Sequence, residues 1–211
     1  MDIKKSIEQF MSKRKPDDRY SSFDYCYNYF YGFYKEGKIG QLSDENNWQE
    51  SCLQLGFYLA SWGMMRGSTL LLKKSARNFK KVIDLISGLD VKFWKIDANN
   101  YTDSNIALLL HFKNELKKLQ GYEKTSDTLI TKIMLGVFAN VPAFDQYFRK
   151  SFSVHTFNKE SLITIKQFYE NNKELLDSNE IWTLDFKTGE YTQNRYTKAK
   201  LIDMCGFINA D

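Results

Sequence analysis

Apolar residues recur at helical spacing along most of the chain, between residues that cap helices and glycines that end them. One such segment runs from Thr69 to Ser87 and ends before Gly88, and its apolar residues follow the i, i+3, i+4, i+7 rule: Phe79, Val82, Ile83 and Ile86. A stripe of this kind is buried against other elements. No internal repeat and no clear linker divides the 211 residues. The pattern therefore predicts a mainly α fold, with residues 1–211 forming a single multi-helix domain.

Helix boundaries are expected where a capping residue precedes an apolar run. Besides 69–87, the expected helices cover residues 3–15, 23–36, 48–65, 103–120, 128–138, 158–176 and 197–208, and one more has Pro142 in its first turn. Two stretches alternate apolar and polar residues as strands do. They are residues 89–101 and residues 181–193, and in the second Lys187-Thr188-Gly189 suits the turn of a small β-hairpin.

An aromatic segment lies near the N-terminus, where nine of the fifteen residues from Tyr20 to Tyr34 are Tyr or Phe. Aromatic residues favour strands, but the cap-like serines at its start and Gly37 after it favour a helix. A helix with nine aromatic residues cannot expose them all, so we expect most of them in the core. Any exposed rings can stack on unpaired bases.

The composition excludes several classes of protein. A content of 43% hydrophobic and 16% aromatic residues argues against disorder. The three cysteines are far apart and are expected to be buried thiols, and the two histidines form no metal-ligand pattern. We therefore expect no metal and no cofactor. The longest apolar-rich run, residues 52–65, is shorter than the roughly 20 residues of a membrane span, and the N-terminus lacks an apolar signal region. A cytoplasmic protein without a membrane partner is expected.

An arginine, Arg66, stands at the junction of two apolar segments, beside Trp62, Gly67 and Ser68. We expect its side chain to be largely buried and to make charge-assisted hydrogen bonds. Arg66, Ser68 and the free N–H groups of a helix starting after Ser68 would together hold a phosphate or carboxylate, with Trp62 beside them. The alternative is that Arg66 pairs with a buried carboxylate and only connects two helices.

Two further charged residues, Lys132 and Asp145, lie in the apolar stretch 128–148. A buried lysine has a lowered pKa and can act as a nucleophile, and an aspartate in the first turn of a helix stays ionised. The alternatives are an interhelical ion pair, or a lysine whose ammonium group reaches solvent.

The sequence Thr131-Lys132, an apolar stretch and then Val141-Pro142-x-x-Asp145 resembles the second half of the helix-hairpin-helix DNA glycosylases. This resemblance implies that Lys132 is the amine nucleophile and Asp145 the catalytic carboxylate. It also implies that a flipped base enters a helical cleft. More broadly, the chain resembles small bacterial proteins.

A basic stretch extends from Arg66 to Lys81, with six basic residues and no acidic one. On a continuous helix, three of them would share one face, opposite the apolar stripe: Lys73, Arg77 and Lys80. Such a face can contact the phosphate backbone of nucleic acid. The alternative is a solvated helix face, and the net charge of the chain is only +4.

The leading hypothesis from the sequence is a nucleic-acid-binding helical protein with DNA or RNA as its partner. It would resemble a DNA glycosylase that acts on a flipped base. The first alternative is a non-catalytic helical interaction or defence protein. The second is an enzyme acting on a small anionic metabolite held by Arg66 and Ser68, although no motif for a known nucleotide loop or nucleophile supports it.

Overall fold

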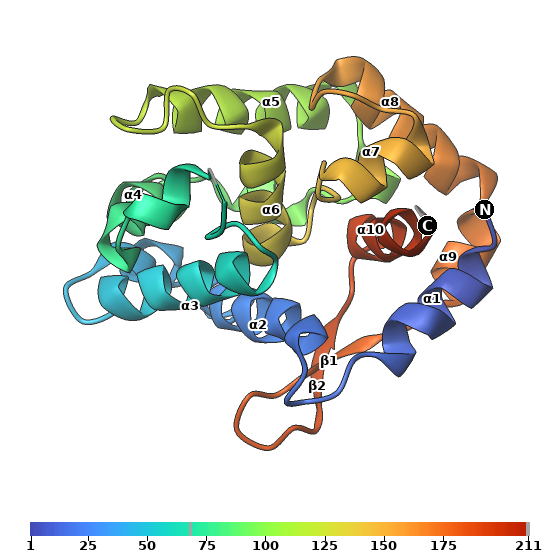
Figure 1. Cartoon of the computed structure of the whole chain (residues 1–211), viewed down its shortest axis with the longest axis horizontal. Helices are drawn as coiled ribbons and strands as arrows, with labels where there is room; N and C mark the ends of the chain where they lie inside the picture. The colour runs from blue at the N-terminus through green and yellow to red at the C-terminus, as the bar shows by residue number, and fades with distance from the viewer. Residues whose placement is uncertain (68, 210–211) are drawn as a thin grey trace.

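In the computed structural model, helix α6 (Asp127–Phe138) lies at the centre of the fold (Figure 1). Every residue from Leu129 to Phe138 is buried. A helix that is apolar on all sides requires other elements around it. Helices pack on α6 from several directions, so a polar side chain on this helix is held inside the protein.

The structure describes residues 1–67 and 69–209, which form a mainly α-helical domain with one small β-hairpin. The other α-helices are α1 (Ile3–Ser12), α2 (Ser22–Lys35), α3 (Trp48–Ser61), α4 (Lys80–Ser87), α5 (Asp103–Lys118), α7 (Gln146–Phe152), α8 (Lys159–Asn171), α9 (Lys173–Ser178) and α10 (Lys198–Ile208). The antiparallel hairpin consists of β1 (Trp182–Leu184) and β2 (Tyr191–Arg195). The predicted fold class and the hairpin are therefore confirmed.

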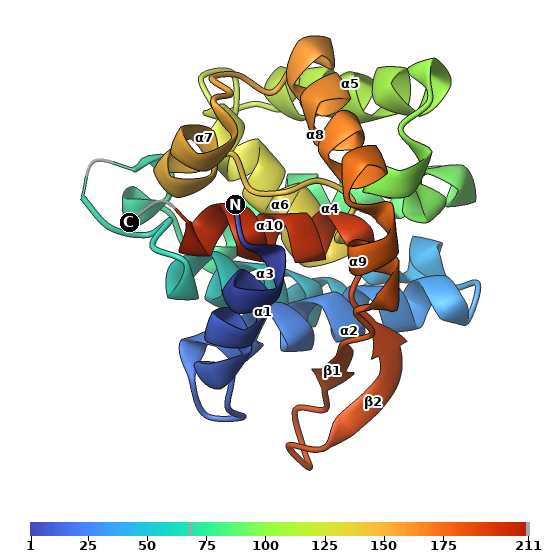
Figure 2. The same ribbon diagram turned by 90° about the vertical axis from the view of Figure 1, so that its right-hand side faces the viewer.

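Helices α2 and α3 pack against each other and against one side of α6, while α5 and α8 lie on the opposite side (Figure 1). Helix α10 packs on α1 and α7, and the hairpin extends from the body beside α2 (Figure 2). The first and last helices of the chain are thus neighbours. Among the described residues, no helix combines the length and the apolar character needed to cross a membrane.

The aromatic segment forms helix α2, as predicted, and its inner face is buried. Phe23, Tyr27 and Phe30 lie in the core, and the rings of Phe23 and Tyr27 stack with centroids 5.6 Å apart. Helix α3 approaches α6 closely where Tyr58 packs on Gly136. This approach is possible because residue 136 has no side chain: a β-carbon there would overlap the Tyr58 ring. This contact fixes Tyr58 beneath the candidate site described below.

The predicted helix over residues 69–87 is wrong in its first half. Two 3₁₀ turns, Leu70–Lys73 and Ala76–Phe79, precede α4, which begins only at Lys80. Residues 73–78 contain no large apolar side chain, so no buried stripe supports a helix there. As a consequence, Lys73, Arg77 and Lys80 do not share the face of one helix.

Other parts of the structure also differ from the prediction. Residues 89–101 form 3₁₀ turns and no strand, because the side chains of Asp90 and Asp97 accept hydrogen bonds from the backbone of those turns. Helix α3 ends at Ser61, and the helix expected over 158–176 is divided at Asn172 into α8 and α9. Helix α7 begins after Asp145 and not at Pro142, because the Asp145 carboxylate caps its backbone.

Candidate functional site

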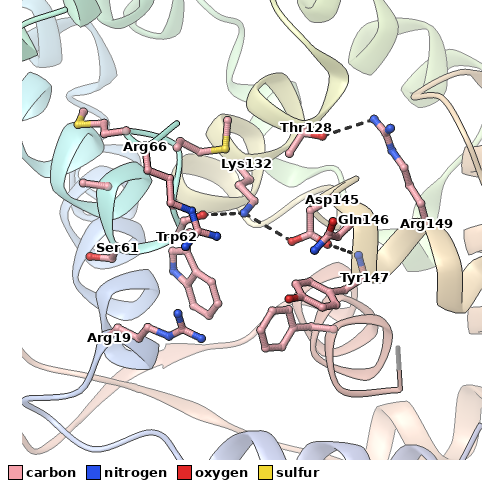
Figure 3. Close-up of a pocket in the computed structure, with 15 residues that line it drawn as sticks. Arg19, Ser61, Trp62, Arg66, Thr128, Lys132, Asp145, Gln146, Tyr147 and Arg149 are labelled. Carbon is pink, nitrogen blue, oxygen red and sulfur yellow. Dashed lines mark hydrogen bonds and ion pairs between the residues drawn. The ribbon is translucent and has the colours of Figure 1, made fainter. Parts of the chain in front are cut away.

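A cavity of about 590 Å³ opens among the end of α3, the start of α7 and the end of α10 (Figure 3). Four of the residues singled out in the sequence line it together: Trp62, Arg66, Lys132 and Asp145. They come from segments that are up to 83 positions apart in the sequence, so the fold alone brings them to one place. We refer to this cavity as the Lys132 pocket.

Lys132 projects from the buried helix α6 into the pocket, and the residue is only 7% exposed. Its Nζ donates a hydrogen bond to the carbonyl oxygen of Trp62 at 3.0 Å and lies 3.5 Å from Oδ2 of Asp145 (Figure 3). Burial lowers the pKa of Lys132, and the negative charge of Asp145 partly opposes this. The environment therefore favours the neutral amine more than water does.

Asp145 caps helix α7 rather than lying in its first turn. Its Oδ1 accepts hydrogen bonds from the backbone N–H groups of Tyr147 and Phe148, both at 3.1 Å. Burial raises the pKa of Asp145, and the Lys132 charge and the Phe148 amide lower it in part. Burial thus displaces the pKa values of the lysine and the carboxylate toward each other.

The segment between α6 and α7 holds Asp145 against the helix that carries Lys132. The N–H of Phe144 donates to Oγ1 of Thr131 at 2.8 Å, and Oγ1 of Thr128 donates to the carbonyl of Phe144 at 2.8 Å. Both threonines belong to α6. The separation of Lys132 and Asp145 is therefore set by short hydrogen bonds within the fold.

Three arginines surround the lysine and the carboxylate: Arg19, Arg66 and Arg149. Arg66 is exposed, which contradicts the expectation of a buried side chain. Its guanidinium lies over Gly63, where a β-carbon would come within 2.8 Å of Nε, so the guanidinium occupies the space that a side chain at residue 63 would take. Within residues 1–67 and 69–209, none of the three arginines lies in ion-pair contact with a carboxylate.

The remaining predicted binding residues divide into two groups. Ser68 lies outside the described residues, and Thr69 is followed by the 3₁₀ turn Leu70–Lys73. Among the described residues, no α-helix therefore supplies the N-terminus expected beside Arg66. Lys73, Arg77 and Lys80 do not line the Lys132 pocket. Arg77 and Lys80 lie over the ring of Trp48 instead, 5.2 and 5.9 Å from its centroid.

Sequence reasoning missed part of the pocket. Arg19 lies with its guanidinium 5.5 Å from the centroid of the Trp62 ring, and Arg149 donates to Oγ1 of Thr128 at 3.4 Å. The rings of Tyr147 and Phe207 also line the pocket, with their centroids 5.3 Å apart. Arg149 stands one helical turn after Asp145, which is a usable local signal. No such pattern indicates Arg19.

A second buried pair, also missed, lies directly beneath the pocket. Lys200 Nζ is 2.9 Å from Oδ2 of Asp203, and the two residues are 1% and 7% exposed. Together with Lys132, Asp145 and Tyr58 they line a small cavity of about 20 Å³. The signal in the sequence was a lysine and an aspartate in the otherwise apolar run of residues 199–208.

Within the described parts of the chain, no group of three or more histidine, cysteine or acidic side chains is arranged to hold a metal ion. The three cysteines are buried and free, as expected: Cys26, Cys52 and Cys205.

Comparison with protein-family models, with curated proteins and with solved structures finds no match for this chain.

Proposed function

We propose that the Lys132 pocket receives a nucleotide of a nucleic-acid strand and that the protein releases its base, with Lys132 as the amine nucleophile and Asp145 as its carboxylate partner. One observation carries the proposal: Nζ of Lys132 lies 3.5 Å from Asp145 Oδ2 at the edge of a cavity ringed by arginines. An enzyme that uses a lysine in this way must keep it partly neutral and place a proton acceptor beside it.

The reaction balances with these two groups. The lone pair of Lys132 Nζ forms a bond to C1′ of the sugar while the bond from C1′ to the base breaks, and the base leaves with that electron pair. Asp145 takes the proton that the amine then loses, and the sugar ring opens to leave an imine between Nζ and C1′. One proton ends on the released base and one on the former ring oxygen. Water hydrolyses the imine and frees the lysine.

The walls of the pocket match the two parts of a nucleotide. Arg19 and Arg66 lie on one side of the Lys132–Asp145 pair and Arg149 lies on the other, an arrangement suited to phosphates on both sides of a flipped nucleotide (Figure 3). The rings of Trp62 and Phe207 meet edge to face with centroids 5.6 Å apart and offer an aromatic surface to a base.

Borohydride trapping tests the nucleophile, because reduction of the imine joins the protein permanently to the DNA. We expect the wild-type protein to form a covalent adduct with oligonucleotides that carry an abasic site or a lesion. Lys132→Met should form none. Asp145→Asn should fold and bind but form the adduct more slowly. Lys118→Met, which removes an exposed lysine from α5, is the matched control and should behave as the wild type.

The absence of any adduct across a broad panel of lesions and abasic sites would overturn the proposal. Adduct formation by Lys132→Met at the wild-type rate would overturn the role of Lys132 in particular.

Binding to the strand is tested through its salt dependence. The test uses a triple variant in which glutamine replaces the three pocket arginines, Arg19, Arg66 and Arg149. This variant should bind every sequence more weakly, and its binding should depend less on salt concentration. The matched control replaces three basic residues outside the pocket with glutamine: Lys73, Arg77 and Lys80. An equal or larger effect of the control variant would move the nucleic-acid interface away from the pocket.

A small anionic metabolite is the second candidate ligand, since a cavity of about 590 Å³ lies within the range of small-molecule sites. Thermal denaturation separates the two. A nucleoside monophosphate that raises the melting temperature as strongly as an oligonucleotide favours the metabolite. Stabilisation that grows with strand length favours nucleic acid.

A further inference from the structure

The buried pair formed by Lys200 and Asp203 calls for an explanation beyond stability. Nζ of Lys200 faces the rings of Phe10 and Phe23, 4.7 and 4.5 Å from their centroids, so the charge is enclosed by apolar groups. Removing two charges from water costs about as much free energy as their attraction returns, and apolar residues of similar volume stabilise a core at least as well. Stability alone therefore does not account for a charged pair in this position.

Asp203 is joined directly to the segment that carries Asp145. Its Oδ1 accepts a hydrogen bond from the N–H of Ala143 at 2.9 Å, while its Oδ2 receives Lys200. Ala143 stands two residues before Asp145, and the N–H of Asp145 donates to the carbonyl of Ala143 at 2.9 Å. Asp203 thus holds the α10 side of a segment whose other side is held by the threonines of α6.

The two buried pairs also share the small cavity of about 20 Å³, so no complete layer of apolar side chains separates them. The negative charge of Asp203 raises the pKa of Lys132 and of Asp145. The other groups that face this region are Arg66, which lowers the pKa of Lys132, and the Tyr58 hydroxyl from α3. Arg19 and Arg149 line the Lys132 pocket but not the small cavity.

We propose that Asp203 is a positioning residue of the Lys132 pocket: it fixes the segment that carries Asp145 and supplies a buried negative charge that acts on Lys132. The importance of this role for catalysis rests on the proposed function. The role itself can be measured without any base release, because it concerns the proton affinity of one amine.

Competitive labelling gives that measurement. Trace acetic anhydride acetylates only neutral amines, and peptide mass spectrometry reports the rate at Lys132 as a function of pH. In Asp203→Asn the side chain can still accept the hydrogen bond of Ala143 but carries no charge. We expect the labelling midpoint of Lys132 to move to lower pH by more than the scatter between replicate titrations. An unchanged midpoint in a folded Asp203→Asn protein would overturn the proposal.

Two further variants separate charge from tethering. Thr131→Val removes one of the two hydrogen bonds between α6 and Phe144 without a change in charge. Because Thr128 and Asp203 still hold the segment, the labelling midpoint of Lys132 should move less in Thr131→Val than in Asp203→Asn. Lys200→Met leaves the charge of Asp203 without its partner and should move the midpoint of Lys132 to higher pH. This opposite sign keeps the proposal testable if Asp203→Asn does not fold, and a midpoint that stays fixed or falls in Lys200→Met would contradict it.

The same variants distinguish the two proposals from each other. If the wild type forms the borohydride adduct, the pH at which the adduct yield rises should move together with the labelling midpoint. A shifted labelling midpoint in a protein that forms no adduct would retain the role of Asp203 and reject the glycosylase function. If the adduct forms and its pH dependence is the same in Asp203→Asn as in the wild type, the glycosylase function is retained and the role of Asp203 is rejected.

Discussion

Gly136→Ala should destabilise the protein, although alanine is the better helix former. Gly136 lies inside α6, and a β-carbon there would come within 2.6 Å of Cδ1 and 3.0 Å of Cζ of the Tyr58 ring. Tyr58 is only 2% exposed, so the ring cannot swing into solvent. Helix propensity favours alanine by up to about 1 kcal/mol, whereas overpacking of a core typically costs about 1–3 kcal/mol. With the full propensity gain subtracted, we expect a net loss of up to about 2 kcal/mol in the free energy of unfolding.

Gly32→Ala in α2 is the matched control. Gly32 is also inside a helix, but a β-carbon at this position meets no atom within 4 Å. The same substitution should therefore stabilise the protein by roughly 0.5–1 kcal/mol. Urea denaturation followed by circular dichroism measures both changes, and each kcal/mol corresponds to about 2–4 °C in melting temperature for a chain of this size.

The result that would refute this reasoning is a Gly136→Ala protein at least as stable as Gly32→Ala. It would mean that the helix can move away from α3 at little cost, and that Tyr58 is not fixed beneath the Lys132 pocket. A destabilised Gly136→Ala protein with a normal slope in urea would support close packing at this contact.

Three further predictions follow from burial. Arg66→Ala should change the free energy of unfolding by less than about 0.5 kcal/mol, because Arg66 is exposed, and it should weaken oligonucleotide binding. A large loss of stability in thermal denaturation would contradict the exposed position of Arg66. The yield of borohydride adduct should rise with pH through the lowered pKa of Lys132, since only the neutral amine attacks, and a midpoint at or above that of an exposed lysine would oppose this. Burial raises the pKa of Cys52 to about 11 and that of Cys205 to about 12. A thiol reagent should therefore label none of Cys26, Cys52 and Cys205 in the native protein and all three after denaturation. Rapid labelling of the native protein would contradict this prediction.

The helix starts that the sequence predicted well are those determined by neighbouring residues. The side chains of Asp2, Thr102, Ser126 and Asn158 each accept a hydrogen bond from a backbone N–H three residues later. A capping residue followed by an apolar stripe contains all the information needed for such a start. The length of a helix depends on what packs against it, and for that reason the start of α4 was misplaced by more than two turns.

The candidate site shows the same division. Lys132 and Arg66 could be found because a charge within an apolar stretch stands out in the sequence, and Asp145 because of the motif around it. Arg19 and Phe207 stand in segments where a basic or an aromatic residue is ordinary. They reach the pocket only through the packing of α10 against α1 and of Trp62 against both of their side chains. No local pattern records such contacts.

The contact between the first and last helices has a consequence for how the protein is made. Phe10 of α1 and Phe207 of α10 lie with ring centroids 6.5 Å apart, and the floor of the pocket includes Asp203. During synthesis, the part of the pocket floor that α10 supplies does not exist until α10 itself has left the ribosome. Contacts between such distant parts of a sequence form late and slowly. Copies that lack α10 therefore expose the apolar face of α1, lack one wall of the Lys132 pocket, and are targets for chaperones and proteases.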